Sequence, residues 1–384
     1  MELTRPETYE KHHSFELFYS RNGSVRTQTE RALQVVTGDL ESVRLNGQAE
    51  VIASVRESLS KQSQDDEAEF QLTPFIADEM SRLEDQELIT YLFHRFRYDV
   101  YPGQHLLDEY PPYLQIEPTS ICNFRCVFCY QTDKRFTTKS SGYMGAMSFE
   151  LYKEIVDQVE GKIHFLSLAS RGEPLLCKDI DKMLEYSIGK FLGLKLNTNG
   201  SVLTEPHIHA ILSGGVNTLV ISADAADEES YARLRVNGKL DKILKNLENF
   251  NTIKEKQYPD AKIITRVSGV MVSEAQNMAE MKQRWGALVD QISFVKYNPW
   301  ESIYASEPNA LTTPCSDLWR RMFIWYDGKV NPCDSDYKST LAVGDVRKST
   351  ISEIWRSEGY RALREHHRNA RRCAVEPCRR CVVI

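Results

Sequence analysis

Short apolar or β-branched runs alternate with helical stretches along the middle of the chain, and this alternation limits the possible folds more than any other feature. The predicted strands are 113–117, 162–168, 194–197, 218–222, 262–267 and 291–297. The predicted helices are 148–160, 179–189, 205–212, 239–255 and 274–286. A strand that returns through a helix to its neighbour pairs with it in parallel. Six such units predict an α/β fold with an open, partial (β/α)6 barrel, because a closed barrel of this kind has eight.

We expect the 384 residues, of which 41% are hydrophobic, to form three parts. Residues 1–108 are predicted to be a helical extension, since apolar residues recur at helical spacing in 48–59 and 79–90. Residues 109–305 hold the strand and helix alternation. Residues 306–384 are predicted to form a separate domain rich in cysteine.

Charge and hydropathy narrow the class of protein. The net charge is −6, and the first residues contain no apolar run of the kind that signal peptides have. We therefore expect a soluble, cytoplasmic protein with no membrane segment and no nucleic-acid partner, because phosphate binding usually needs a concentrated basic face. The basic cluster at 361–372 lies on a predicted helix. It is interpreted as a solvated face, with contact to an anionic substrate as the alternative.

Cysteine spacing points to a metal centre, because nine thiols in a reducing compartment are unlikely disulfide partners. Cys122, Cys126 and Cys129 follow the first predicted strand directly. Three thiolates at these intervals can hold three corners of a cubic 4Fe-4S cluster and leave one iron open to a small molecule. The alternatives are a structural zinc ion with a fourth ligand from elsewhere, or reduced thiols in a core.

This cysteine loop resembles the Cys-x3-Cys-x2-Cys loop of the radical S-adenosylmethionine (radical SAM) family. The aromatic Phe128 before the last cysteine fits the family pattern, in which this side chain packs near the cluster and the adenine. The resemblance implies a partial (β/α)6 barrel with the cluster loop after its first strand. It also implies that SAM binds the open iron and is cleaved to a 5′-deoxyadenosyl radical, with an electron from a flavodoxin- or ferredoxin-like reductant.

The resemblance extends to residues that follow later strands. Ser170-Arg171-Gly172-Glu173-Pro174 resembles the family's Gly-Gly-Glu segment, with Arg171 in place of the first glycine. Glu173 would then accept hydrogen bonds from the methionyl ammonium of SAM. Three further residues are carried over as contacts to SAM: Asn197, Ser222 and Arg235. Turn chemistry at strand ends is the alternative explanation for these polar residues.

The C-terminal cysteines form a second pattern. Cys315 is followed by a predicted hairpin with an Asp-Gly turn at 327–328, then by Cys333, and later by Cys373, Cys378 and Cys381. This order resembles the SPASM and twitch domains that are appended to many radical SAM enzymes. The resemblance implies one auxiliary 4Fe-4S cluster, most simply held by Cys315, Cys333, Cys378 and Cys381. A zinc ribbon is the alternative.

Three residues are candidates for roles beside the clusters. Cys373 is surplus to the auxiliary set, so it could replace a ligand, have no role, or donate a hydrogen atom to a substrate radical. Cys177 is interpreted as a packed residue that could also be such a donor. Arg266, on the fifth predicted strand, is a candidate for steering a hydroxyl or acidic group of the substrate if it points into the barrel.

The twitch-type resemblance implies a small polar substrate: a sugar, amino sugar, cyclitol or sugar nucleotide whose alcohol carbon is oxidised with electron transfer to the auxiliary cluster. Candidate substrate residues, with interface packing as the alternative, are Tyr297, Asn298, Trp300, Glu301, Arg320, Arg321, Asp334 and Asp336. Three other functions stay open. They are a radical epimerase or dehydratase with a cysteine hydrogen donor, a maturase of ribosomally made peptides (RiPPs), and a non-enzymatic metal-binding scaffold.

Overall fold

A parallel sheet forms the centre of the computed structural model, which describes residues 6–11, 15–20, 24–38, 48–64, 67–273 and 276–384. Its six parallel strands are β2 (Tyr113–Ile116), β4 (Phe165–Leu168), β5 (Gly193–Thr198), β6 (Thr218–Ser222), β8 (Ile264–Met271) and β9 (Gln291–Lys296). Each pairs in parallel with the next in that order. All six predicted strands are therefore confirmed, and so is the α/β fold class.

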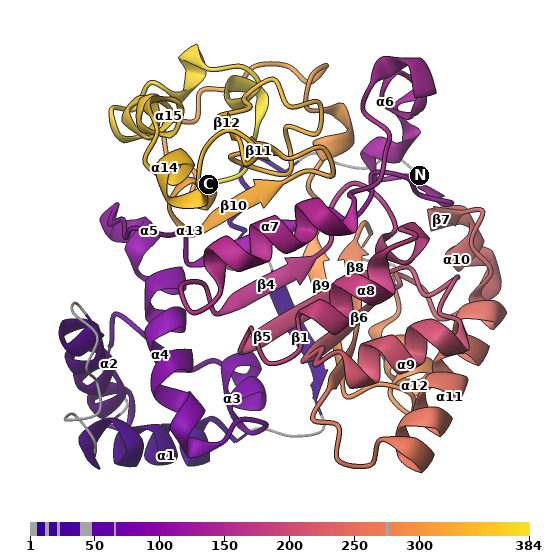
Figure 1. Cartoon of the computed structure of the whole chain (residues 1–384), viewed down its shortest axis with the longest axis horizontal. Helices are drawn as coiled ribbons and strands as arrows, with labels where there is room; N and C mark the ends of the chain where they lie inside the picture. Colours follow the sequence, from indigo (N-terminus) through magenta and orange to yellow (C-terminus); the bar gives the residue numbers. More distant parts are fainter. Residues whose placement is uncertain (1–5, 12–14, 21–23, 39–47, 65–66, 274–275) are drawn as a thin grey trace.

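Helices cover the outer face of these strands (Figure 1). They are α7 (Phe149–Val159), α8 (Ile180–Tyr186), α9 (Glu205–Ser213), α10 (Glu228–Leu234), α11 (Leu240–Gln257) and α12 (Met278–Trp285). Strand β5 shows how the sequence separates the two faces: Leu194 and Leu196 are fully buried in the core, whereas Lys195 and Asn197, on the other face, are half-buried. The barrel interior is thus the more polar face of the sheet.

The barrel stays open. Ten strands form one sheet in the order β1-β9-β8-β6-β5-β4-β2-β10-β11-β12, so β1 and β12 are its outer strands in the part of the chain that the structure describes. We call the edge where the six parallel strands end the mouth, and the edge where they begin the floor. In parallel barrels, ligands gather at the mouth.

The N-terminal residues form a helical layer with its own hydrophobic core, which reaches Tyr113 and Phe165 at the floor. Its helices are α1 (Val25–Gly38), α2 (Gln48–Gln62), α3 (Pro74–Met80), α4 (Asp85–Asp99) and α5 (Tyr101–Gln104). The helical prediction missed β1 (Phe15–Ser20), which pairs antiparallel with β9. A six-residue edge strand alternates for too short a distance to give a clear period-2 signal.

The C-terminal residues extend the sheet of the barrel. Their elements are α13 (Asp317–Arg320), β10 (Arg321–Ile324), β11 (Lys329–Asn331), β12 (Gly344–Asp345), α14 (Ile351–Trp355) and α15 (Glu358–Arg368). Strand β10 pairs in parallel with β2 and antiparallel with β11, which confirms the hairpin predicted around its Asp-Gly turn. Gly328 has φ +82°, a conformation that glycine adopts without steric cost. Figure 1 shows this region and the helical extension on different sides of the barrel.

Short elements complete the described chain. They are β3 (Arg125–Cys126), β7 (Arg235–Val236), α6 (Lys134–Thr137) and the 3₁₀ turns Tyr130–Thr132, Lys139–Ser141, Pro174–Leu176, Trp300–Ser302, Arg372–Ala374 and Cys378–Arg380. Among the helices of the described residues, none combines the length and apolar character that crossing a bilayer requires.

Candidate active site

The cysteine loop lies at the mouth, directly after β2, and a two-stranded pairing holds it. Strand β3 pairs with β7 so that Cys126 lies opposite Arg235. The Arg235 Nε donates to Asp224 Oδ2 at 2.5 Å, and its Nη1 lies 3.8 Å from Cys126 Sγ. Its guanidinium carbon is 5.6 Å from the ring centroid of Phe128. Arg235, predicted to contact SAM, thus links Cys126 and Phe128 of the loop to Asp224, an acid after β6 that sequence reasoning did not single out.

A chain of amide hydrogen bonds joins the loop to the segment after β5. Asn199 Nδ2 donates to Asn123 Oδ1 at 2.9 Å, and Asn123 Nδ2 donates to Ser201 Oγ at 2.9 Å. Sequence reasoning missed this network, although Asn123 lies inside the cysteine motif and Asn199 inside the Asn-Thr-Asn-Gly turn. The network ties the cysteine loop to the segment after β5.

Three thiols come together on this short loop. Cys126 is buried, and Cys122 and Cys129 are half-buried. Burial raises the pKa of the Cys122 thiol to about 12 and also raises the pKa values of Cys126 and Cys129. Thiolates, not thiols, bind metal. Iron binding would therefore have to release these protons, as the donor set of a three-cysteine cluster loop requires.

The Gly172-Glu173 segment packs against the start of the cysteine loop. A Cβ atom on Gly172 would lie 2.2 Å from the carbonyl oxygen of Thr119, so only glycine fits here. The buried Glu173 carboxylate accepts from Thr198 Oγ1 at 2.6 Å, from Asn199 N at 2.6 Å and from the N–H two residues after it. Burial raises its pKa. A carboxylate has about four lone-pair positions, which leaves one for the predicted methionyl ammonium.

Two other predicted SAM contacts face the barrel interior. Asn197 is half-buried on β5, and its Oδ1 has no hydrogen-bond partner among the described residues. Ser222 ends the neighbouring strand β6 and is also half-buried. A buried amide oxygen without a partner is costly unless a ligand satisfies it. Asn197 therefore fits a position beside the cofactor, as the resemblance implied.

Four C-terminal cysteines line one cavity: Cys315, Cys333, Cys378 and Cys381. Among the described residues, no three or more Cys, His, Asp or Glu side chains converge closely enough to hold a single metal ion. Four cysteinates around one space can each bind a different iron of a polynuclear cluster. A single tetrahedral zinc ion is the alternative that the sequence left open.

A buried arginine organises this cavity. Arg372 is 1% exposed, and its guanidinium donates to the carbonyl oxygens of Cys378 and Cys381 at 3.3 and 2.9 Å. Arg364 is also buried and donates to Leu318 O at 2.9 Å. The prediction that 361–372 is a solvated face is wrong for these two residues, because both guanidinium groups are buried and donate to backbone carbonyl oxygens. Arg372 also places a positive charge beside the sulfurs.

The remaining cysteines lie elsewhere. Cys373 is exposed and does not line the cavity of the other four. Cys177 is buried in the main hydrophobic core, with its sulfur 3.7 Å from Met147 O, in agreement with its interpretation as a packed residue. None of the nine cysteines, all of which lie in the described residues, forms a disulfide.

The arginine that replaces the family's glycine joins the mouth to the C-terminal region. Arg171 donates from Nε and Nη2 to the two carboxylate oxygens of Glu117, each at 2.6 Å, and both side chains are buried. Its Nη1 donates to Tyr337 O at 2.8 Å, and its guanidinium carbon is 4.2 Å from the Trp325 ring centroid. The departure from the family pattern thus builds a buried ion pair at this junction.

Several candidate substrate residues are occupied by protein contacts. Trp300 Nε1 donates to Phe128 O at 3.1 Å. Asp334 forms an ion pair with Lys11 at 3.0 Å, and Asp336 accepts from Tyr304 Oη at 2.6 Å. These contacts favour interface packing, the alternative that the sequence left open.

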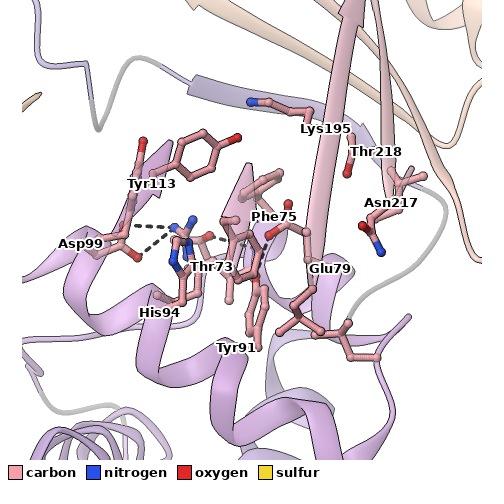
Figure 2. Close-up of a pocket in the computed structure, with 18 of the residues that line it drawn as sticks. Thr73, Phe75, Glu79, Tyr91, His94, Asp99, Tyr113, Lys195, Asn217 and Thr218 are labelled. Carbon is pink, nitrogen blue, oxygen red and sulfur yellow. Dashed lines mark hydrogen bonds and ion pairs between the residues drawn. The ribbon is translucent and has the colours of Figure 1, made fainter. Parts of the chain in front are cut away.

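A second cavity lies at the floor, and three candidate substrate residues from the sequence line it: Arg266, Arg320 and Arg321. It measures about 900 Å³ and lies between α3, α4 and the starts of the parallel strands. Arg266 lines it, so this candidate points toward the floor and not toward an outer helix. Figure 2 shows the cavity with Lys195 and Tyr113 on one side and Tyr91 and His94 on the other.

Comparisons with known proteins agree with this geometry. The model of the radical SAM superfamily matches residues 116–273, and that of the SPASM iron-sulfur cluster-binding domain matches residues 315–382. Together these domains imply binding of SAM, a 4Fe-4S cluster and an auxiliary iron-sulfur cluster. They confirm the resemblance from which the cofactors were predicted.

Two curated relatives and one solved structure are similar to the chain. Mycofactocin maturase MftC of Mycolicibacterium smegmatis is 26% identical over 194 residues, 49% of this chain and 47% of the relative. The chain thus spans about half the length of the first curated relatives it matches. SAM-dependent 2-deoxy-scyllo-inosamine dehydrogenase of Niallia circulans is 23% identical over 283 residues, 72% of this chain and 94% of the relative. Streptococcus suis SuiB, solved with its precursor peptide, shares the fold at TM-score 0.53, 13% identity, and 88% and 83% coverage.

Proposed function

Because the chain is a radical SAM enzyme with a C-terminal SPASM-type domain, we propose that it oxidises an alcohol carbon of a small polar substrate. The substrate class is a sugar, amino sugar, cyclitol or sugar nucleotide. When bound, SAM and its cluster supply a 5′-deoxyadenosyl radical that removes the hydrogen atom from the carbinol carbon, and the auxiliary cluster accepts the second electron. The hydroxyl loses its proton, so the alcohol becomes a ketone and 5′-deoxyadenosine is released.

The observation that carries this proposal is the cavity lined by four C-terminal cysteines. Four thiolates complete the coordination of one cubic cluster, and a fully coordinated cluster is suited to electron transfer and not to substrate binding. The radical epimerase and dehydratase alternatives need a thiol beside the substrate. Cys373 is exposed and Cys177 is packed in the core, which supports oxidation over these alternatives.

The protein's own residues orient the cofactor and fix the loop. Glu173 offers a carboxylate to the methionyl ammonium, and Asn197 and Ser222 offer polar groups from the interior face of neighbouring strands. Arg235 holds the cysteine loop to the barrel through Asp224. The Arg171–Glu117 pair contacts the C-terminal region through both of its members, because Arg171 donates to Tyr337 O and Glu117 accepts from Tyr326 N.

The relative from Niallia circulans supports the substrate class. Its printed activity is the SAM-dependent dehydrogenation of a cyclitol, and the match covers 94% of its length. Because the identity is 23%, this relative supports the reaction type, dehydrogenation, more strongly than it supports any particular ring as the substrate. A small flavodoxin- or ferredoxin-like protein is our proposed electron donor for the SAM cluster.

Peptide maturation is the second candidate. A mycofactocin maturase is 26% identical over about half of this chain. Against it stands the N-terminal layer, which consists of five helices and the edge strand β1 among the described residues. That layer differs from the three-stranded winged-helix module that we expect in a peptide-binding relative.

The test is 5′-deoxyadenosine formation by the anaerobically reconstituted protein with SAM and a reductant. Dialysable metabolites from the source cell are compared with its peptide fraction. Stimulation by the metabolites, with a loss of two hydrogens in a sugar or cyclitol, is the expected result. Stimulation by peptides alone would replace the proposal with peptide maturation. No deoxyadenosine with either fraction would contradict both.

A further inference from the structure

The floor cavity is lined by a helical layer on one side and by the beginnings of the barrel strands on the other. Helices α3 and α4 contribute Glu79, Tyr91 and His94, and strands β2 and β5 contribute Tyr113 and Lys195 (Figure 2). Its volume of about 900 Å³ lies in the range that small-molecule sites occupy. Because the helical extension covers it, this cavity is a feature of the whole chain and not of the barrel alone.

Two cations in this cavity lack a full set of partners. The Lys195 ammonium has no hydrogen bond or ion pair among the described residues, and its nearest ring contact is Tyr113, 5.7 Å from the ring centroid. Arg266 is 4% exposed; its Nε donates to Gln291 Oε1 at 2.6 Å, whereas its buried Nη2 has no partner. Burying the Arg266 nitrogen without a partner is costly, and a bound anion would offset this cost and pair with the half-buried Lys195 as well.

A third cation adds to this charge. Arg321 lies 5.1 Å from the same Tyr113 ring and donates to Tyr98 Oη at 2.6 Å. The acids on the wall offset part of the charge: Asp99 forms an ion pair with Arg95 at 2.8 Å, and Glu79, which accepts from the neutral Tyr91 Oη at 2.6 Å, acts on Lys195 and Arg266. Eight lysines and arginines and five acids line the cavity, so positive charge is in excess.

The cavity opens on the same interior face of the barrel as the predicted SAM contacts, although Asn197 and Ser222 do not line it. Lys195 lies two residues before Asn197 on the same face of β5, and residues at this interval are about 6.6 Å apart along a strand. Arg266 lies on β8, one strand beyond β6, which carries Ser222. A sugar ring with one substituent is long enough to reach from the Asn197 position to Lys195.

We propose that the floor cavity binds a phosphate group of the substrate through Lys195, Arg266 and Arg321, so that the enzyme acts on a phosphorylated sugar or cyclitol and not on a neutral one. The inference deepens the proposed function and rests on it for the sugar. Lysine and arginine supply charge-assisted hydrogen bonds to phosphate oxygens, which are stronger than neutral ones. The aromatic rings of Tyr113, Phe165 and His94 form the apolar wall beside them.

The test is isothermal titration calorimetry on the anaerobic, reconstituted holoenzyme with SAM present. The probes are inorganic pyrophosphate and glucose 1-phosphate, with glucose as the neutral probe. We expect both phosphate probes to bind at least about tenfold more tightly than glucose, because ionised partners strengthen hydrogen bonds. The main variant is Lys195→Met, which removes a charge without breaking any hydrogen bond between described residues. It should weaken both phosphate probes at least about tenfold.

Two further variants make the result specific. Lys195→Arg keeps the charge and should keep most of the affinity, whereas Lys256→Met, an exposed lysine on α11, should leave it unchanged. Equal affinity for glucose and glucose 1-phosphate, or phosphate binding that Lys195→Met does not change, would overturn the inference. So would no binding by either phosphate probe.

Calorimetry measures binding without turnover. A negative binding result can therefore be distinguished from a failure of the proposed oxidation. Phosphate binding that depends on Lys195, combined with deoxyadenosine formation on peptides alone, would keep the cavity assignment and reject sugar oxidation. Stimulation by metabolites without any phosphate binding would keep the oxidation and reject the anion site.

Discussion

The mouth and the floor of the barrel differ in how their charged side chains are paired. At the mouth, Glu173, Arg171 and Arg235 are each held by several partners within the protein. At the floor, Lys195 has no hydrogen bond or ion pair among the described residues, and the buried Nη2 of Arg266 has no partner. The contrast concerns charged groups, since Asn197 at the mouth also leaves a buried amide oxygen without a partner. An unpaired buried cation costs stability, so an anion bound at the floor would stabilise the folded protein.

The largest effect is expected at the mouth, where Cys122, Cys126 and Cys129 can be replaced together by alanine. SAM cleavage should fall to background, because no open iron remains to bind SAM. The auxiliary site, which shares none of these residues, should keep about half of the iron. Deoxyadenosine by chromatography and iron by analysis, with electron paramagnetic resonance of the reduced protein, would measure both. A variant that has lost all iron would contradict two independent cluster sites.

Next in size is the loss of the auxiliary cluster in Cys378→Ser. Oxidised product should fall by about 100-fold or more, because the substrate radical then lacks its electron acceptor, while deoxyadenosine still forms. Cys373→Ser is the matched control: it changes an exposed cysteine that does not line the cavity, and it should leave product yield unchanged. A drop in product for Cys373→Ser, with the cluster intact, would restore a catalytic role for that thiol.

The next effect is a loss of protein stability when the buried ion pair at the mouth is broken. Arg171→Met leaves Glu117 buried without its partner, and we expect it to lower the free energy of unfolding by about 3–5 kcal/mol. The double variant Glu117→Gln with Arg171→Met should recover much of this loss, because no buried charge is left. Urea unfolding under anaerobic conditions measures the difference. A single variant as stable as the wild type would show that the mouth does not depend on this pair.

The smallest effect is a pH dependence from the floor. Burial, with Arg321 and Arg266 adding to it, lowers the pKa of Lys195 from 10.5 to about 8. Between pH 8 and 10.5 the unfolded chain therefore binds more protons at this group than the folded chain. The free energy of unfolding should rise with pH in this window, by at most about 1.4 kcal/mol per pH unit. Below pH 8 the cost of the buried ammonium is fully present.

The measurement compares the free energy of unfolding of the wild type and of Lys195→Met between pH 8 and 10.5. The variant lacks the contribution of Lys195, and the contributions of the other titratable groups cancel in the difference. The charged or titratable groups that act on the Lys195 ammonium from neighbouring elements are Tyr98 on α4, Glu79 on α3, Arg266 on β8 and Arg321 on β10. Parallel curves for the two proteins would show that the ammonium is well solvated, and the contrast between mouth and floor would then lose its main support.

Local patterns made the barrel and the cluster loop predictable. Each parallel strand is a short apolar run followed by an amphipathic helix, so its periodicity is visible within a few residues. The three cysteines of the loop also lie within eight consecutive residues, Cys122–Cys129. The four auxiliary cysteines required a family resemblance, because they come from three separate segments of the C-terminal region.

Features that depend on distant partners were not predictable. Arg171 pairs with Glu117, which is 54 positions away, and Arg372 donates to Thr313 O, which is 59 positions away. The floor cavity combines helices of the N-terminal layer with strands of the barrel. Arg372 illustrates the cause: its amphipathic surroundings indicate solvent, and only the tertiary fold brings carbonyl groups to its guanidinium.

The contact between the two ends of the described chain sets an order of assembly. Tyr9 N donates to Val382 O at 2.8 Å, Ile384 N donates to Tyr9 O at 3.0 Å, and Lys11 pairs with Asp317 at 2.7 Å. During synthesis the ribosome produces the barrel and its cysteine loop well before Cys378 and Cys381. The segment around Tyr9 can therefore form these contacts only after the segment around Val382 has been synthesised, and contacts between segments so distant in sequence form late in folding. Iron delivery to the auxiliary site is then a late event, which follows completion of the barrel.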